Sequence, residues 1–319
     1  MRYIMWSGGW DSTYLLCKQA RESDETIQPV YINYRHGNDV NERKFRAKLL
    51  DMIRAKTDIK AAIQAPLEIQ EEALPTTPEY ETAYEQCRSA LEELYGENNL
   101  FRFFGKAALL FPSPEIGMEA PPPGLWGNDL GRFGRMLRDH GMTVSDDGTV
   151  NTDNSDPGFA MVVGCFKYPI LFINEIQMLA DVKEWGYFDD VFQNTWSCYS
   201  NMDRQCGVCR SCEVKWLSGD AFRWRFDEKA QRDHDIKLFL QQLDEENGTR
   251  YADYFTHYII NGNWVTVNTD DSSRSSITTY NVGTDEYKQT QEKSERLMQY
   301  FSYLENNWPE GKTLNAPII

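Results

Sequence analysis

A glycine-rich turn near the amino terminus carries the residues best suited to phosphate chemistry. The chain passes from the apolar run of residues 3–6 into the sequence SGGWDST. A strand that leads through such a turn into a helix aims backbone N–H groups and the positive helix end at one anion, and phosphate is the favoured anion. Gly8 and Gly9 allow the positive φ and the close backbone approach that a side chain would prevent.

The polar side chains of this turn point to the same chemistry. Ser7, Ser12 and Thr13 place hydroxyl groups around the two glycines. Asp11 either caps the following helix or helps to hold a Mg²⁺ ion on the phosphates. A plain strand-to-helix turn is the alternative. It would be favoured for two glycines alone, but not for Ser-Gly-Gly-x-Asp-Ser-Thr directly after a strand.

Four of the seven cysteines form a second motif, with the spacing C-x7-C-x2-C-x2-C over residues 198–212. Four thiolates suit one tetrahedral zinc ion. An iron–sulfur cluster is the alternative, but here the isolated cysteine comes first and no Cys-Pro follows. A four-cysteine zinc site has no open position for substrate, so we predict a structural metal. The predicted ligands are Cys198, Cys206, Cys209 and Cys212.

The composition excludes several classes of protein. The 319 residues are 41% hydrophobic and 26% charged, which is typical of a soluble globular protein. No window approaches the roughly 18 apolar residues of a membrane span, and the apolar start is too short for a signal peptide. We therefore expect a cytoplasmic protein without a membrane partner. A net charge of −16 disfavours a nucleic-acid substrate, tRNA included, because polyphosphates are bound through Lys and Arg.

The pattern of apolar residues predicts an α/β fold. Strands are expected at residues 3–6, 27–34 and 58–66, with a helix over 41–56 between the last two. This alternation predicts a doubly wound, mostly parallel sheet with ligands beyond the carboxyl ends of its strands. The glycine-rich turn lies at that edge.

Later segments are less regular. We predict a helix around residues 80–94, an irregular proline-rich loop over 110–127, and a hairpin or surface excursion over 145–158. A strand is expected at 159–166, a hairpin across residues 261–263 within 254–269, and a helix at 294–305.

Both motifs resemble those of the PP-loop ATP pyrophosphatase superfamily and, within it, the 7-cyano-7-deazaguanine synthase (QueC-like) family. Residues 7–13 look like the superfamily's pyrophosphate loop. Residues 31–50, YINYRHGNDVNERKFRAKLL, resemble the family's second strand and following helix, and residues 179–212 resemble its zinc segment. The resemblance covers roughly the first 55 residues and residues 160–215.

This resemblance implies an ATP-dependent, AMP-forming C–N ligase that adenylates the carboxylate of 7-carboxy-7-deazaguanine for reaction with ammonia to give the amide, and activates the amide with a second ATP to give the nitrile. The implied cofactors are ATP, Mg²⁺ and Zn²⁺. The catalytic residues implied are Asp11, Ser12 and His36. The nucleotide-binding residues implied are Trp6, Ser7, Gly8, Gly9, Trp10, Asp11, Ser12, Thr13, Tyr14, Leu15, Leu16 and Arg35.

The resemblance also predicts the domain organisation. A PP-loop nucleotide-binding domain of the adenine-nucleotide alpha-hydrolase type spans residues 1–190, a zinc-binding segment spans 191–220, and an α+β extension of unknown role spans 221–319.

The chain departs from the family in its middle. The substrate loop usual in the family is not found, residues 113–127 lie roughly where it belongs, and Glu175 stands where the family has a lysine. A deazaguanine base is expected to stack on aromatic side chains near the turn, with Phe111, Trp126 and Tyr199 as candidates.

Two other functions stay open beside the ligase. The activated base could be joined to a protein amine instead of ammonia, or the chain could bind nucleotide as a regulatory protein without turnover. The expected partners are the small-molecule base and ammonia, with no direct nucleic-acid contact. A homodimer and a protein acceptor are left open.

Overall fold

The computed structural model describes residues 1–33, 39–95, 100–120, 131–198, 204–217, 219–261, 267–268, 276–277 and 285–308. The chain divides into two compact units, Met1–Ser197 and Cys198–Ile319. The four cysteines of the predicted zinc segment and all residues after them fall in the second unit.

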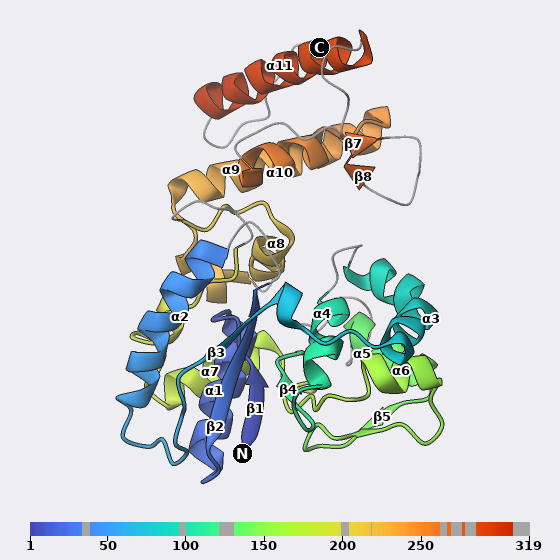
Figure 1. The fold of residues 1–319 in the computed structure, drawn as a ribbon. Helices are drawn as coiled ribbons and strands as arrows, with labels where there is room; N and C mark the ends of the chain where they lie inside the picture. Colours follow the sequence, from blue (N-terminus) through green and yellow to red (C-terminus); the bar gives the residue numbers. More distant parts are fainter. Residues whose placement is uncertain are drawn as a thin grey trace. The chain divides into compact units, whose positions relative to one another are not determined.

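In its described residues, the first unit is built around a four-stranded sheet in the order β3-β2-β1-β4 (Figure 1). The strands are β1 (Arg2–Met5), β2 (Ile27–Asn33), β3 (Leu67–Gln70) and β4 (Glu115–Ile116). Every pairing in this sheet is parallel, with Met5 opposite both Val30 and Ile116. The predicted α/β class with a parallel sheet is confirmed, and the arrangement is compatible with a doubly wound fold.

Helices and short strands fill the connections of the first unit. They are α1 (Trp10–Glu22), α2 (Asp39–Arg54), η1 (Glu71–Ala73), α3 (Pro78–Tyr95), α4 (Phe101–Ala108), α5 (Gly131–Asp139), the hairpin β5 (Thr143–Val144) and β6 (Val150–Asn151), α6 (Pro157–Val162), α7 (Glu175–Glu184) and η2 (Phe192–Asn194). The predictions of helices over 41–56 and 80–94 are confirmed. The hairpin predicted over 145–158 is present but lies earlier, with strands at 143–144 and 150–151, and residues 157–158 begin α6.

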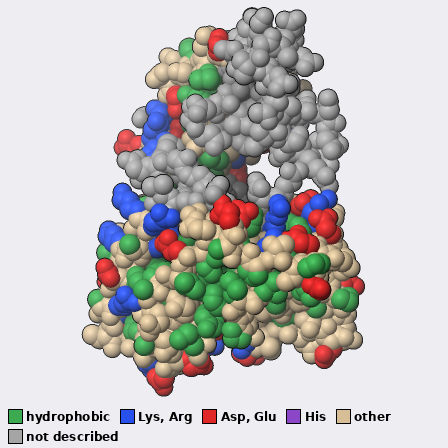
Figure 2. Space-filling model, viewed as in Figure 1, with side chains coloured by type: hydrophobic (Ala, Val, Ile, Leu, Met, Phe, Trp, Pro, Cys, Tyr) green, Lys and Arg blue, Asp and Glu red, His purple; other side chains and the backbone are tan. Residues whose placement is uncertain are grey.

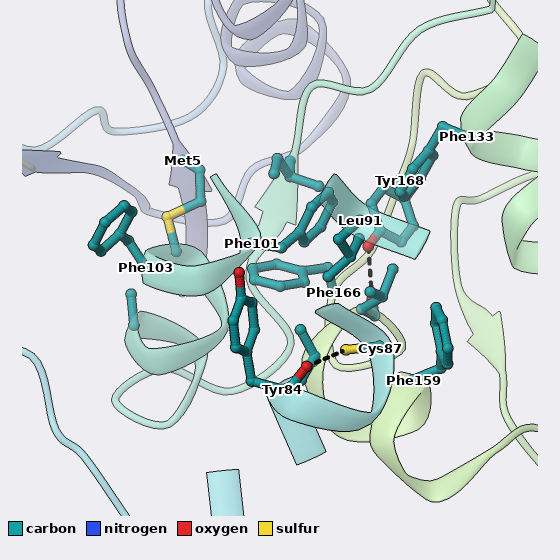
Figure 3. Packing of buried hydrophobic residues seen from close by; sticks show 14 of the residues in the cluster. Met5, Tyr84, Cys87, Leu91, Phe101, Phe103, Phe133, Phe159, Phe166 and Tyr168 are labelled. Carbon is teal, nitrogen blue, oxygen red and sulfur yellow. Dashed lines mark hydrogen bonds between the residues drawn. The ribbon is translucent and has the colours of Figure 1, made fainter. Parts of the chain in front are cut away.

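The main hydrophobic core joins the sheet to α3, α4, α5 and α6, which gather beside β1 and β4 (Figure 1). Figure 3 shows its aromatic centre, where the Phe101 and Phe133 rings stack with centroids 5.5 Å apart. The buried Tyr80 hydroxyl donates a hydrogen bond to the Phe101 carbonyl at 2.8 Å. A Cβ on Gly105 would lie 2.3 Å from that hydroxyl, so only glycine lets α3 and α4 approach this closely.

Helices α1 and α7 pack against each other through one tyrosine. The Tyr14 hydroxyl donates to the Asp181 carboxylate, and its ring stacks on Trp185 with centroids 5.2 Å apart. Burial, and then the Asp181 contact, raise the pKa of Tyr14 far above its usual value. The hydroxyl therefore stays protonated, and its hydrogen bond to Asp181 links α1 to α7.

The second unit is mainly helical in its described residues. It contains α8 (Arg210–Leu217), η3 (Gly219–Arg225), α9 (Glu228–Asn247), α10 (Tyr251–Asn261), the strand pair β7 (Val267–Asn268) and β8 (Ser276–Ile277), and α11 (Asp285–Asn307). Asp227 caps α9 by accepting from the Ala230 N–H, and Gly248 ends it with a positive φ. Phe255 of α10 meets Phe301 of α11 edge to face, with ring centroids 5.3 Å apart.

Four predicted elements were wrong in place or type. The third strand lies at Leu67–Gln70, and the predicted stretch 58–66 contributes one isolated parallel bridge, between Ile63 and Ile27. The segment 110–127, predicted to be irregular, contains β4 (Glu115–Ile116), because its backbone pairs with β1. The apolar run 159–166 lies mostly in α6 and the turn after it. A short apolar run fits a strand or a helix equally well. Here Pro157, at the first position of α6, favours the start of a helix. Residues 254–261 lie in α10, so the predicted hairpin does not begin there.

Apolar side chains also reach the surface of the first unit, as the green atoms of Figure 2 show. Large exposed ones include Leu109, Leu110, Phe172 and Ile176. Scattered exposed apolar residues of this kind are ordinary on folded proteins. Within the described part of the chain, no helix has both the length and the apolar character that crossing a membrane requires.

Candidate functional site

The glycine-rich turn lies at the carboxyl end of β1 and leads directly into α1. Gly8 has φ +83°, in the region that favours glycine. A Cβ at this position would lie 2.7 Å from Cγ of Arg46, a buried residue of α2. Gly8 is therefore required both by its backbone conformation and by the close approach of α2.

Hydroxyl groups hold the turn together from within. The Ser7 N–H donates to the Ser12 hydroxyl at 3.3 Å, and the two serine hydroxyls lie 3.1 Å apart. The Gly9 N–H donates to the Ser7 hydroxyl at 3.2 Å. Thr13 accepts a hydrogen bond from the Trp6 indole N–H at 3.1 Å. These contacts fix the turn before any ligand arrives.

The first turn of α1 has no side-chain cap. Its N-cap is Gly9, which has no side chain to occupy the helix end, and the first intrahelical bond runs from the Thr13 N–H to the Gly9 carbonyl at 3.0 Å. In α7, by contrast, the Asn174 side chain accepts from the Gln177 N–H. The N–H groups of a helix's first turn lack intrahelical acceptors and favour a bound anion.

The segment that leads to the unit boundary also contacts the turn. The Trp196 N–H donates to the Gly8 carbonyl at 3.1 Å. The Trp196 ring stacks on Phe45 of α2 with centroids 4.9 Å apart. The Arg46 guanidinium lies 3.3 Å from the Tyr31 ring centroid and 3.1 Å from the Glu68 carboxylate. The turn is thus contacted by Arg46 of α2 and by Trp196 of the segment before Cys198.

Three acidic side chains lie close together at the start of α1. Asp11 of α1, Glu119 from the loop after β4 and Glu175 of α7 place carboxylate oxygens within 4.8 Å of one another. Glu175 is fully buried, and the other two are partly buried. The Asp11 Oδ1 atom is buried and has no hydrogen-bond partner among the described residues.

The structure separates the predicted nucleotide-binding residues into two groups. Ser7, Gly8, Gly9, Asp11, Ser12 and Thr13 form the turn and the first turn of α1. The side chains of Trp6, Trp10, Tyr14, Leu15 and Leu16 are buried in the first unit. Trp10, for example, meets Phe192 edge to face, with centroids 4.9 Å apart. These five side chains pack in the core beneath the turn, so any contact of these residues with a nucleotide would come from their backbone.

Several predicted residues lie outside the described part of the chain. They are Arg35, His36, Trp126 and Tyr199. Phe111 is described, and its ring stacks on Tyr3 of β1 with centroids 4.7 Å apart. Its ring therefore packs on the first half of β1, away from the carboxyl end where the turn begins.

The four cysteines of the second unit form a compact buried cluster. Their Sγ atoms lie within 4.8 Å of one another. The Cys206 N–H donates to the Cys198 sulfur at 3.2 Å, and the Cys209 N–H donates to the Cys206 sulfur at 3.3 Å. Such N–H groups stabilise thiolates, and four sulfurs at this spacing can surround one tetrahedral ion.

Two side chains hold the backbone between Cys206 and Cys209. The Trp216 indole donates to the Gly207 carbonyl at 3.0 Å, and the Lys237 ammonium donates to the Val208 carbonyl at 2.8 Å. Lys237 also forms an ion pair with Glu213. Helices α8 and α9 thereby fix the loop that carries two of the sulfurs.

The electrostatics of the cysteine cluster favour a bound cation. Contacts with Cys198, then with Cys206, and burial raise the pKa of the Cys209 and Cys212 thiols well above the usual range. Deprotonation of these two thiols is opposed because the charges would repel one another. The pKa of Cys206 is lowered instead, since the contact with Cys198 raises it but hydrogen bonds with Cys209 and Cys212 lower it more. A divalent ion removes the repulsion and releases the protons.

Sequence reasoning missed two residues of this site. Arg46 belongs to a helix whose apolar face was predicted, yet no local pattern marks which of its basic residues turns inward. Glu119 lies within the irregular loop and has no motif around it. Glu175 was noticed only as a departure from the family's lysine. No protein-family model matches the chain, and a comparison with curated proteins finds no match.

Proposed function

We propose that this chain is an ATP-dependent, AMP-forming C–N ligase that activates a carboxylate, with 7-carboxy-7-deazaguanine as the substrate and ammonia as the acceptor. The observation that carries this proposal is the turn between β1 and α1. Gly8 has a positive φ, Gly9 provides no side-chain cap for α1, and the Ser7 and Ser12 hydroxyls lie at the same turn. The resemblance of residues 7–13, 31–50 and 179–212 to 7-cyano-7-deazaguanine synthases supports the choice of substrate.

The chemistry needs an anion site of this kind. A carboxylate oxygen is a poor leaving group until it is attached to AMP, and the attack on the α-phosphorus releases pyrophosphate. The first-turn N–H groups of α1 and the Ser7 and Ser12 hydroxyls would hold the phosphate oxygens during this step. Because the hydroxyls are already positioned by their mutual contacts, little reorganisation is needed when the nucleotide binds.

Asp11 suits a Mg²⁺ ion on these phosphates. Its Oδ1 atom is buried and accepts no hydrogen bond from the described residues, and a carboxylate oxygen is a hard ligand that Mg²⁺ prefers. A bound Mg²⁺ would neutralise charge on the pyrophosphate as it leaves. Asp11 would then act by orienting the ion relative to the helix end.

The four cysteines would have a structural role. All four are buried and can fill the four positions of a tetrahedral zinc ion, which leaves no position for a substrate. Zinc would stabilise the start of the second unit, where the described residues 198 and 204–209 form no helix or strand before α8.

A reaction with three components tests the proposal. The full chain would be incubated with ATP, ammonia and 7-carboxy-7-deazaguanine, and mass spectrometry would follow AMP, the amide, the nitrile and the mass of the protein itself. We expect AMP and a deazaguanine amide or nitrile. A protein mass increased by one deazaguanine group would instead support the protein-amine acceptor.

Asp11→Asn is the matching variant, because it keeps the shape of the side chain and removes the charge. It should lower AMP formation by roughly 100-fold, since the metal-bound phosphates would be misplaced. Asp24→Asn, an exposed aspartate beyond the other end of α1, should react like the unaltered chain. AMP formation that is absent in the unaltered chain, or equal in the Asp11→Asn variant, would contradict the proposal.

A further inference from the structure

The carboxylates of Asp11, Glu119 and Glu175 come from three separate elements. Asp11 lies in the first turn of α1, Glu175 is the first residue of α7, and Glu119 follows β4. Their carboxylate oxygens nevertheless lie within 4.8 Å of one another. The chain must therefore bring together segments more than 100 residues apart in sequence to build this cluster.

The loop that carries Glu119 is fixed on both sides. A Cβ on Gly117 would lie 3.0 Å from the Ser12 backbone N and 3.1 Å from the Asp11 carbonyl O, so this glycine packs directly on the start of α1. The Ala120 N–H donates to the Ile173 carbonyl at 3.0 Å, two residues before α7. Glu119 is thus held between the two helix ends.

The spacing of the oxygens suits a divalent cation. In an octahedral Mg²⁺ site with bonds of about 2.1 Å, two ligand oxygens lie about 3.0 Å apart when adjacent and about 4.2 Å when opposite. Separations of up to 4.8 Å therefore need only small side-chain adjustments to reach coordination. Three carboxylates form an all-oxygen donor set of the kind that Mg²⁺ and Mn²⁺ bind.

Helix ends alone explain only part of this cluster. Acidic residues are favoured in the first turn of a helix by the positive helix end, and this accounts for Asp11 and Glu175 without a metal. Glu119 is not in a helix, so this explanation does not apply to it. A cation bound at this point would contact all three carboxylates, Glu119 included.

We propose that Asp11, Glu119 and Glu175 form a Mg²⁺ site that the protein fills before ATP binds. The inference rests on the proposed function and extends it, because Asp11 alone would only help to hold a metal that arrives with the nucleotide. Three carboxylates beside the phosphate site repel a polyphosphate until a cation neutralises them. Metal binding therefore precedes nucleotide binding.

The experiment uses the full chain without nucleotide and Mn²⁺ as the probe, with free Mn²⁺ measured by electron paramagnetic resonance. We expect one bound Mn²⁺ per chain, displaced by an excess of Mg²⁺. Glu119→Gln and Glu175→Gln should each weaken Mn²⁺ binding by roughly tenfold or more, because an amide keeps the shape but loses the charge. Asp24→Asn should bind Mn²⁺ like the unaltered chain.

Two outcomes would overturn the metal site: no Mn²⁺ binding by the nucleotide-free chain, or unchanged binding by Glu119→Gln. If the Glu175→Gln variant unfolds at lower temperature, the Glu119→Gln result still decides, since Glu119 lies outside the helices. A separate titration with ATP in excess Mg²⁺ tests the proposed function. Nucleotide binding without prior Mn²⁺ binding would refute only the metal site, and Mn²⁺ binding without nucleotide binding would refute only the ligase.

Discussion

Replacing Gly8 by alanine should destabilise the first unit through a specific steric conflict. The new Cβ would lie 2.7 Å from Arg46 Cγ and 3.6 and 3.7 Å from the Arg46 backbone N and Cα. Arg46 cannot move aside easily, because its guanidinium is held over the Tyr31 ring and against Glu68. The conflict must therefore be relieved by shifting α2 or the turn itself.

The magnitude follows from three contributions. A positive φ costs a residue with a Cβ about 1–2 kcal/mol, partly offset by the reduced entropy of the unfolded chain, about 0.4–1 kcal/mol. Overpacking against Arg46 adds about 1–3 kcal/mol. We expect Gly8→Ala to lower the free energy of unfolding by about 2–4 kcal/mol in total.

Gly186 provides the matched control. It has φ +72°, and a Cβ added there would meet no other atom within 4 Å, so Gly186→Ala carries the backbone cost without the conflict. Urea unfolding followed by tryptophan fluorescence would compare the two variants. Gly186→Ala should lower the free energy of unfolding by about 1 kcal/mol. In an Arg46→Ala background, which lacks Cγ, Gly8→Ala should cost less. Equal losses for the two glycine variants would show that the contact with Arg46 has no energetic weight, and would refute the reasoning.

The remaining predictions concern the cysteine cluster and one surface turn. Cys209→Ser should reduce zinc from one equivalent per chain, measured by elemental analysis, and lower the unfolding temperature, because structural zinc contributes roughly 10 kcal/mol or more to folding; an unchanged metal content would contradict the assignment. Lys237→Met should speed zinc release to a chelator by roughly tenfold, since the Val208 carbonyl loses its donor, and an unchanged release rate would count against this role. Hydrogen bonds from Ser145, then from the Thr149 backbone and hydroxyl, lower the pKa of Asp147 to about 2. Because the folded pKa lies below the unfolded one, the stabilisation by Asp147 is complete above about pH 4 and is lost as the pH falls toward 2. A carboxyl titration by NMR with a midpoint near the ordinary aspartate value would contradict this.

The two motifs could be predicted from the sequence because their chemistry is local. Gly8, Gly9, Ser7 and Ser12 are neighbours along the chain, and a strand-to-helix turn needs nothing distant to aim its N–H groups. The cysteine spacing likewise brings four sulfurs together within one short segment. Amphipathic periodicity was sufficient for α3 and α11, which are long enough to show it.

The local sequence pattern did not decide whether a short apolar segment forms a strand or a helix. Residues 159–166 suit a strand or a helix equally well, and the position of Pro157 together with the packing of Phe159 and Val162 in the core selects the helix. The third strand lies at Leu67–Gln70, where four successive residues pair with β2, whereas the apolar stretch before it forms one isolated parallel bridge, between Ile63 and Ile27.

The tertiary structure alone decided what surrounds the turn. Arg46 contacts Gly8 because α2 packs against the turn after β1, where Tyr31 of β2 and Glu68 of β3 also hold the guanidinium, and Glu119 meets Asp11 and Glu175 because the loop after β4 contacts the starts of α1 and α7. None of these residues has a sequence neighbour that predicts its partner. Sequence determines which backbone groups a local turn can present, whereas the charges placed beside that turn depend on contacts between distant segments, which only the packed sheet and helices define.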